Sequence, residues 1–184
     1  MDEMTRLKAL SAKVGADPLL VQAAGGNTSL KQGGVMWIKA SGTWLQHAQE
    51  RDIFVPVAMA PLLSGLERDD PACEACTDFV RADLNSLGLR PPIETTVHAS
   101  LAHRIVVHVH CVETISWAIR TDAEAMLGPR LARFSWAFIP YRRPGLPLAK
   151  EIRLRLKPDT DVLVLGNHGL VVAGDSVGEA EKLL

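Results

Sequence analysis

The chain has 184 residues, a formal net charge of −1 at pH 7 and a hydrophobic fraction of 47%. This length fits one domain with a sizeable core, and the near-neutral charge excludes electrostatic recruitment of nucleic acid or an anionic membrane. Three cysteines cannot all pair, the charged N-terminal stretch is not typical of a signal peptide, and the apolar runs are too short to span a bilayer. We therefore expect a cytoplasmic protein with a single domain over residues 1–184.

Hydrophobic periodicity predicts helices along the whole chain, interleaved with short strands. The predicted helices span residues 4–14, 61–66, 72–87, 94–101, 112–119, 122–127, 148–156 and 177–184. Ser176 is a candidate N-cap for the last of these. This helical pattern reaches the final residue without a C-cap, which leaves room for a further C-terminal segment.

The strand pattern indicates the kind of sheet. The predicted strands span residues 27–31, 35–40, 53–58, 104–110, 136–141, 161–165 and 170–172. Gln32-Gly33-Gly34 is typical of a hairpin turn, and Pro56 indicates an edge or an irregular strand. Because several connections are too short for a crossover helix, we expect a mixed or antiparallel sheet.

His108-Val109-His110 is the sharpest local feature. Residues two apart on a strand project to the same face, so both imidazoles can reach one metal ion. The alternative is a pair of histidines on a polar strand face or at its end. The aliphatic run at 105–107 weakens that alternative, because it delivers the pair at the end of a buried strand, where unpaired imidazoles cost free energy.

Gly166-Asn167-His168-Gly169 provides a third candidate ligand after the strand at 161–165. The two glycines allow a tight turn and a close approach to a ligand, although the same pattern suits a plain turn. Together with His108 and His110, His168 would offer zinc three neutral imidazoles and leave one coordination position open, as a catalytic site requires.

Glu94 opens the predicted helix at 94–101, with His98 one turn later. One interpretation is a carboxylate beside the metal that acts as acid or base. The other is an exposed glutamate in the first turn, which the helix dipole favours.

Two small loops and one cysteine pair remain. The segments 25–29 and 40–43 carry glycines and hydroxyls that can bind an anion through backbone N–H groups, but each alone is more often a plain turn. Cys73 and Cys76 have no second Cys-x-x-Cys beside them and no strand before them, so we interpret them as structural residues on the helix at 72–87.

Taken in order, these motifs resemble the class II aldolase/adducin family over about residues 15–184. The matching segments are Gly26-Asn27-Thr28-Ser29, Ala40-Ser41-Gly42, Glu94 with His98, His108-x-His110 and Asn167-His168-Gly169. No single motif is specific, but five in this order are. The chain is most similar to the branch that includes the aldolase portion of bifunctional rhamnulose-phosphate aldolase/alcohol dehydrogenases.

The resemblance implies the α/β fold of that family, a three-layer α/β/α sandwich around a largely antiparallel or mixed sheet. It also implies a homo-oligomer, a tetramer with active sites between neighbouring subunits. Zinc, or another divalent metal, would be held by His108, His110 and His168.

The resemblance also assigns roles in catalysis and substrate binding. Glu94 would be the catalytic acid/base, and Tyr141 matches a tyrosine that assists proton transfer at the subunit boundary. Asn27, Ser41 and Gly42 would face the phosphate of a small sugar substrate.

Pro92 departs from the family pattern, because the aldolases place a phosphate-binding serine there and proline has neither a hydroxyl nor an N–H. The resemblance implies a zinc-dependent lyase that cleaves or forms a C–C bond in a ketose or ketose phosphate through a metal-stabilised enediolate. Glu94 would move the proton, with a pKa raised by a partly dry site. The alternatives are a sugar-phosphate epimerase or dehydratase on the same site, a non-catalytic adducin-like scaffold, and a metal-binding regulatory domain.

Overall fold

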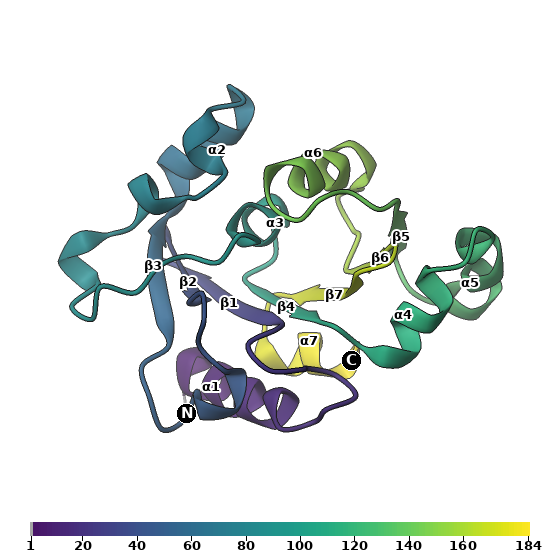
Figure 1. Ribbon diagram of the computed structural model, residues 1–184, viewed down its shortest axis with the longest axis horizontal. Coiled ribbons are helices and arrows are strands. Elements are labelled where there is room, and N and C mark those ends of the chain that lie inside the picture. Colours follow the sequence, from purple (N-terminus) through teal and green to yellow (C-terminus); the bar gives the residue numbers. More distant parts are fainter. Residues whose placement is uncertain (1) are drawn as a thin grey trace.

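The structure, a computed structural model that describes residues 2–184, places one mixed sheet between two layers of helices (Figure 1). The seven strands found in these residues have the order β3-β2-β1-β4-β7-β6-β5. They span Phe54–Ala58 (β3), Val35–Lys39 (β2), Asn27–Gln32 (β1), Ile105–Val109 (β4), Gly169–Gly174 (β7), Val162–Leu165 (β6) and Trp136–Ile139 (β5). Every neighbouring pair is antiparallel except β5 and β6, which are parallel. The predicted largely antiparallel or mixed sheet is confirmed.

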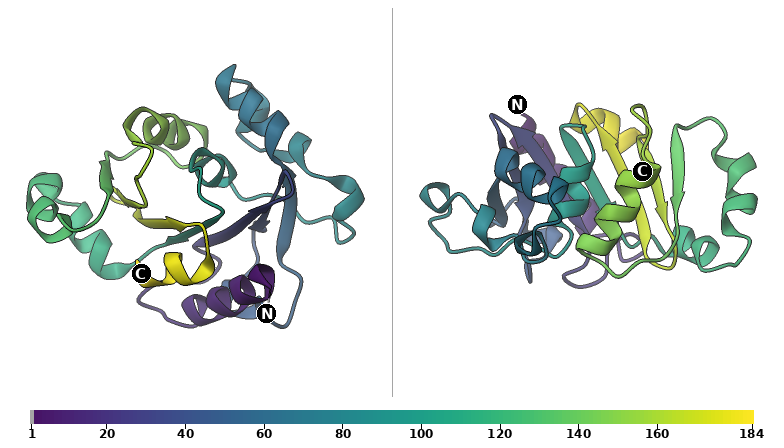
Figure 2. Two further views of the ribbon diagram at one scale, coloured as in Figure 1. Left: turned by 180° about the vertical axis from the view of Figure 1, so that it is seen from behind. Right: turned by 90° about the horizontal axis from the view of Figure 1, so that it is seen from above.

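Helices cover both faces of this sheet, so the predicted three-layer α/β/α fold is also confirmed (Figures 1 and 2). The α-helices span Glu3–Gly15 (α1), Met59–Glu67 (α2), Thr95–Ser100 (α3), Val112–Ala118 (α4), Ala123–Leu131 (α5), Leu146–Arg155 (α6) and Val177–Lys182 (α7). Helices α1 and α7 lie on one face and α3 and α6 on the other, with α2 next to α3. None of the helices within residues 2–184 combines the length and apolarity needed to cross a bilayer.

Strand β4 lies at the centre of the sheet, and all five of its residues are buried. Side chains alternate between the two faces of a strand. Val107 and Val109 pack in the core beneath α1 and α7, whereas Val106 packs in the core beneath α3 and α6. By the same alternation, His108 and His110 are directed to the face that α3 covers.

Local signals explain the ends of several elements. The predicted hairpin forms between β1 and β2, where Gln32 pairs with Val35. Pro56 lies on β3 at the edge of the sheet, where its missing N–H removes no ladder hydrogen bond from a central strand. The Ser176 side chain accepts a hydrogen bond from the Glu179 N–H and begins α7, as predicted.

The predicted helix at 72–87 is wrong. This segment forms three short 3-10 turns, Pro71–Cys73, Thr77–Phe79 and Ala82–Leu84. Cys76 adopts a left-handed φ of 57°, which ends a helical run, and Val80 instead bridges Val57 on β3. Apolar residues at helical spacing therefore reach the core through turns that follow the sheet edge. The two cysteines are buried in that core as free thiols.

Candidate metal centre

Three histidines from two separate segments meet at one end of the sheet. His108 ends β4, His110 follows it, and His168 lies in the turn between β6 and β7. Their ring centroids are 4.9, 5.0 and 5.5 Å apart. The candidate ligand atoms of the three side chains all lie within 4.8 Å of one another. The same-face placement predicted from His-x-His and the third histidine from the glycine-flanked turn are therefore found together.

The turn that presents His168 differs from the expectation in one respect. Asn167, not a glycine, takes the left-handed conformation, with a φ of 51°, which asparagine tolerates better than most residues. Gly169 serves a different purpose. A Cβ at this position would collide with the carbonyl oxygen of Val109 on β4, so the absence of a side chain lets β7 approach the strand that carries the other two histidines.

Glu94 lies directly beside two of these rings. It precedes α3, and only 6% of its surface is exposed. Its Oε1 atom is 3.2 Å from Nε2 of His108 and 3.0 Å from Nε2 of His168. Its other oxygen, Oε2, accepts a hydrogen bond of 2.6 Å from Nδ2 of Asn27. The interpretation of Glu94 as an exposed first-turn glutamate is therefore wrong.

The charges of the cluster are coupled. Burial alone would raise the pKa of Glu94, but the adjacent His108 and His168 rings hold that pKa well below its usual value. This is the reverse of the raised pKa expected from a dry site. Burial and the neighbouring His108 lower the pKa of His110 to about 4, so its ring is neutral near pH 7 and keeps a lone pair for a ligand.

Buried polar atoms without a hydrogen-bond partner indicate which kind of ligand this cluster could bind. Oε1 of Glu94 and Nε2 of His108 are both buried without a hydrogen-bond partner among the described residues. Nδ1 of His108 lies 3.0 Å from the Leu170 carbonyl oxygen. Three imidazoles with an adjoining carboxylate are a donor set suited to zinc, so the residues present fit a divalent metal.

The sequence matches the family described as the class II aldolase and adducin N-terminal domain over residues 7–184. The chain belongs to this family. The N-terminal class II aldolase domain of a conserved protein from Thermoplasma acidophilum is 27% identical, with a TM-score of 0.83 over 98% of this chain and 88% of that one. L-fuculose-1-phosphate aldolase from Thermus thermophilus is 14% identical, with a TM-score of 0.60 over 98% of this chain and 86% of that one, a likeness of fold alone.

One curated relative of this class II aldolase domain is much longer. YuxG of Bacillus subtilis, named an uncharacterized oxidoreductase, is 30% identical over 179 residues, which is 89% of this chain and 25% of that protein. The chain therefore spans about a quarter of the length of the curated relative it matches.

Other predicted site residues of the domain lie around the cluster. Asn27 begins β1 opposite His108, and its Oδ1 atom is buried without a hydrogen-bond partner among the described residues. Ser41 and Gly42 are exposed beyond the end of β2, and the Ser41 N–H donates to the carbonyl of Arg90 over 2.9 Å. Tyr141 is 56% exposed beyond β5. The structure thus joins Asn27 to Glu94, whereas Ser41, Gly42 and Tyr141 lie further out.

His98 lies on α3, one turn after Glu94. It is completely buried, and its Nδ1 atom is 2.8 Å from Oγ of Ser29 on β1. Burial, with a smaller effect of His108, lowers the pKa of His98 to about 3. His98 is therefore a neutral ring that joins α3 to the sheet behind the three-histidine cluster.

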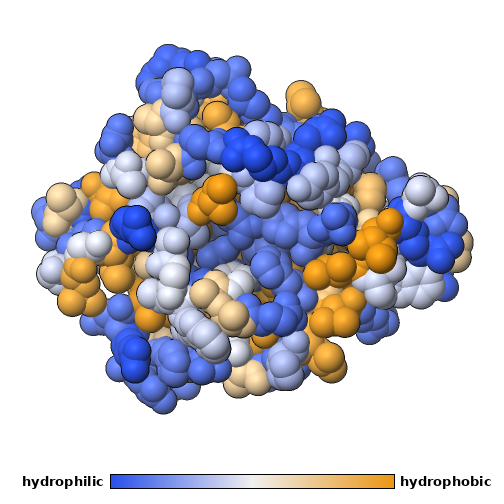
Figure 3. All heavy atoms as spheres, viewed as in Figure 1, coloured by the Kyte–Doolittle hydropathy of each residue, from blue (hydrophilic) through white to orange (hydrophobic). Residues whose placement is uncertain are grey.

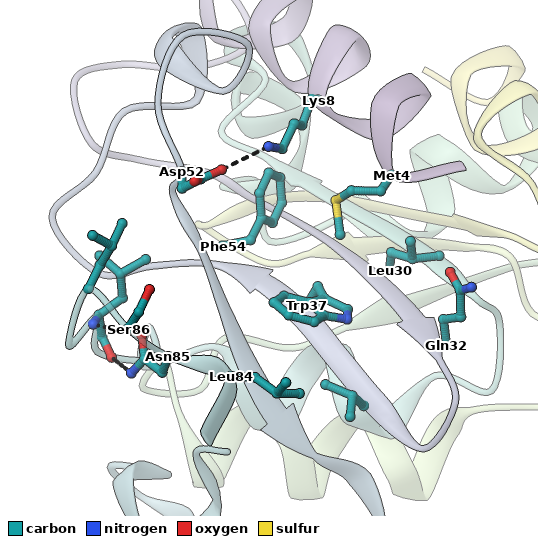
Figure 4. Close-up of a pocket in the computed structure, with 13 residues that line it drawn as sticks. Met4, Lys8, Leu30, Gln32, Trp37, Asp52, Phe54, Leu84, Asn85 and Ser86 are labelled. Carbon is teal, nitrogen blue, oxygen red and sulfur yellow. Dashed lines mark hydrogen bonds and ion pairs between the residues drawn. The ribbon is translucent and has the colours of Figure 1, made fainter. Parts of the chain in front are cut away.

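One groove of the domain is separate from the histidines. It measures about 580 Å³ and lies over the outer face of β1–β3, between α1 and the segment 84–89 (Figure 4). Trp37 and Phe54 form its floor, and the Lys8–Asp52 ion pair closes one end. A second cavity of about 530 Å³ includes Gly42 and Arg51. Of the two, the second contains a residue predicted to face substrate.

Lys39 is a buried residue near the site that the sequence motifs did not single out. Its side chain lies at the end of β2, and only 2% of the residue is exposed. The one signal in the sequence is a lysine at the end of an otherwise apolar strand, directly before Ala40-Ser41-Gly42.

Proposed function

We propose that this class II aldolase domain is a metal-dependent lyase that cleaves or forms a carbon–carbon bond in a ketose or ketose phosphate. His108, His110 and His168 would hold zinc or another divalent metal. The observation that carries the proposal is the approach of one Glu94 oxygen to two of these rings, 3.2 Å from His108 and 3.0 Å from His168. A buried acid/base thereby adjoins a donor set with room for an open coordination position.

The metal, when bound, would supply Lewis-acid polarisation of a substrate carbonyl. The chain itself supplies the proton transfer. Because the Asn27 amide donates to Oε2, the carboxylate of Glu94 is fixed, and Oε1 is the oxygen left to accept a proton. Its low pKa keeps the carboxylate ionised near neutral pH, so Glu94 enters the reaction as a base. In the cleavage direction, it then returns this proton to the carbon left behind.

A scaffold role is less consistent with these residues. A buried carboxylate and three clustered imidazoles cost desolvation free energy, and a scaffold would have no use for them. Epimerisation or dehydration would use the same groups and remains the alternative chemistry. Pro92 removes one phosphate contact, so free ketoses are candidate substrates alongside ketose phosphates.

We also propose a cytoplasmic homotetramer in which Tyr141 lies near the metal centre of a neighbouring subunit. Support comes from apolar surface beside the cluster. Helix α4 starts two residues after His110, and its ends carry the exposed Val112 and Ile119, with 48% and 59% of their surfaces accessible. Figure 3 shows hydrophobic side chains gathered over this helix. Such patches often mark contacts between proteins.

The proposal is tested by elemental analysis of the purified chain, followed by a screen for aldehyde release from ketose phosphates and free ketoses. The expected result is about one divalent ion per chain and turnover of at least one substrate class that stops on chelation and returns with zinc. Metal without turnover would favour the regulatory alternative. A chain that binds no metal would support the scaffold and overturn the proposal.

A further inference from the structure

Lys39 is a cation enclosed by protein. Residues on β2 alternate between the two faces of the sheet, so Lys39 shares a face with Trp37. Trp37 lines the open groove, whereas Lys39 is only 2% exposed. Burial lowers the pKa of Lys39 to about 8, although Glu94 acts in the opposite direction. A buried ammonium is tolerated only where nearby acceptors replace its water.

The acceptors come from the segment at 16–26, which joins α1 to β1. The Nζ atom of Lys39 donates to the carbonyl of Ala24 over 2.6 Å and to that of Gly26 over 3.0 Å. This connection forms no helix or strand, so its carbonyls have no regular ladder to satisfy them. The Lys39 ammonium therefore supplies the hydrogen bonds that a helix or strand would otherwise supply to these two carbonyls.

The same segment contacts the metal centre with its backbone. A Cβ at Gly25 would lie 2.9 Å from Nδ1 of His110, and one at Gly26 would lie 2.9 Å from the carbonyl oxygen of His108. Gly26 also has a φ of +65°, which L side chains rarely adopt. The next residue, Asn27, holds the Glu94 carboxylate. Movement of this segment would therefore affect the His110 ring, the His108 backbone and the Glu94 carboxylate together.

We propose that Lys39 is a positioning residue for the metal centre. Its ammonium fixes the carbonyls of Ala24 and Gly26, which sets how closely the 25–27 backbone approaches His110, His108 and Glu94. The consequence for catalysis rests on the function proposed above. The effect of Lys39 on the order of the 25–27 backbone does not rest on that function, because the ammonium contacts the Ala24 and Gly26 carbonyls of the same chain.

Lys31 provides a matched control. It is a half-buried lysine on neighbouring strand β1, and its Nζ also donates to two backbone carbonyls, those of Leu101 and His103. These carbonyls lie before β4, at the opposite end of that strand from His108. Loss of Lys31 removes the same kind of contact without touching the 25–27 backbone.

The first measurement is amide hydrogen exchange of the full chain without added metal. For Lys39→Met we expect exchange of the 22–29 segment to rise by about tenfold or more, because a charge-assisted hydrogen-bond pair is lost. Lys31→Met should leave this segment unchanged. Lys39→Arg, which keeps a cation with several N–H donors, should recover most of the protection. Unchanged exchange in Lys39→Met would overturn the proposal, whatever the metal results.

The second measurement is zinc affinity by competition with a chelating dye, followed by kcat and KM at saturating zinc. Lys39→Met should weaken zinc binding or lower kcat by about 10–100-fold with a smaller change in KM, the usual effect of losing a group that orients metal ligands. Lys31→Met should do neither. Equal losses in the two variants would reduce Lys39 to a general stability role and overturn the proposal. A wild-type chain that binds no metal would overturn only the proposed function. The amide hydrogen exchange measurement would still test whether Lys39 positions the 25–27 backbone.

If Lys39→Met does not fold, as judged by far-UV circular dichroism, Lys39→Gln replaces it. Gln retains N–H donors but loses the charge and reaches less far, so the same changes are expected at smaller amplitude. Protection and zinc affinity equal to wild type in Lys39→Gln would count against the proposal.

Discussion

Nδ1 of His108 lies 3.0 Å from the carbonyl oxygen of Leu170 on the adjacent strand β7. A carbonyl only accepts hydrogen bonds, so the neutral His108 ring carries its proton on Nδ1 and leaves the Nε2 lone pair directed at the cluster. The contact with the Leu170 carbonyl on β7 therefore selects the tautomer that a metal ligand needs. The sheet register thereby prepares His108 for metal binding.

The first prediction concerns the ligand set. His108→Ala or His168→Ala should abolish stoichiometric zinc binding, because two imidazoles and a carboxylate no longer form the three-histidine site. Elemental analysis after dialysis measures this directly. His103→Ala is the control, since His103 precedes β4 at its far end and should retain full metal content. Retention of zinc in His168→Ala would remove His168 from the ligand set.

The second prediction separates catalysis from metal binding. Glu94→Gln keeps the size of the side chain and the acceptor for the Asn27 amide, but it cannot take up a proton. Turnover should fall by about 10²–10⁴-fold, while metal content stays near wild type. If Glu94→Gln kept full activity, Tyr141 would become the better candidate for the acid/base. Loss of the metal would instead show Glu94 to be an essential ligand.

The third prediction uses the close approach of Gly25 to His110. In Gly25→Ala the new Cβ would lie 2.9 Å from the ring Nδ1 and 2.9 Å from the Gln22 carbonyl, so either the ring or the loop must move. Zinc affinity should fall by about 10–100-fold, as for other changes that misorient a ligand. Gly178→Ala is the matched control. Gly178 lies in α7 with nothing within 4 Å of its Cβ position, so affinity should be unchanged and stability should rise by up to about 1 kcal/mol.

The fourth prediction concerns assembly. Light scattering at micromolar concentration should give the mass of a tetramer, with exposed residues of α4 and Tyr141 near the contact. Val112→Lys would place a charge on the apolar surface at the start of α4 and should weaken assembly. Leu154→Lys is the control, because Leu154 is 82% exposed on α6 and lies on a different helix. A monomeric wild type would contradict the prediction.

The sequence was most informative where short-range rules determine structure. Strand alternation placed His108 and His110 on one face, and the hairpin signal at Gln32-Gly33-Gly34 located β1 and β2. The residue pattern offered His168 and Glu94 as candidates with plain alternatives, and the resemblance to a family favoured placing both at the same site. Tertiary contacts decided the remainder. The segment 72–87 has helical spacing, but Val80 pairs with the sheet edge, and no local pattern reveals that partner.

Electrostatics of the site also could not be predicted from composition. The low pKa of Glu94 depends on two rings that arrive from distant segments, and burial alone gives the opposite direction. The burial of Lys39 could not be predicted for the same reason, because it depends on a segment distant from its own strand. A lysine near a strand end is usually exposed, and only the path of the 16–26 segment shows that its ammonium is enclosed.

The fifth prediction is a pH dependence of stability that originates at Lys31. Burial lowers the pKa of Lys31 from 10.5 to about 7, with Asp175 acting in the opposite direction. Between these two values the unfolded chain binds more protons than the folded chain, so the stability due to Lys31 rises with pH and is lost as pH falls toward 7. The free energy of unfolding of wild type minus that of Lys31→Met should therefore be flat below about pH 7 and then increase by up to about 1.4 kcal/mol per unit. Urea denaturation at a series of pH values measures this difference. Lys13→Met is the control, because the Lys13 side chain is 73% exposed, and its difference should stay nearly constant. A Lys31 difference that decreased with pH would show that the half-buried ammonium is stabilised, rather than penalised, by the two carbonyls that it contacts.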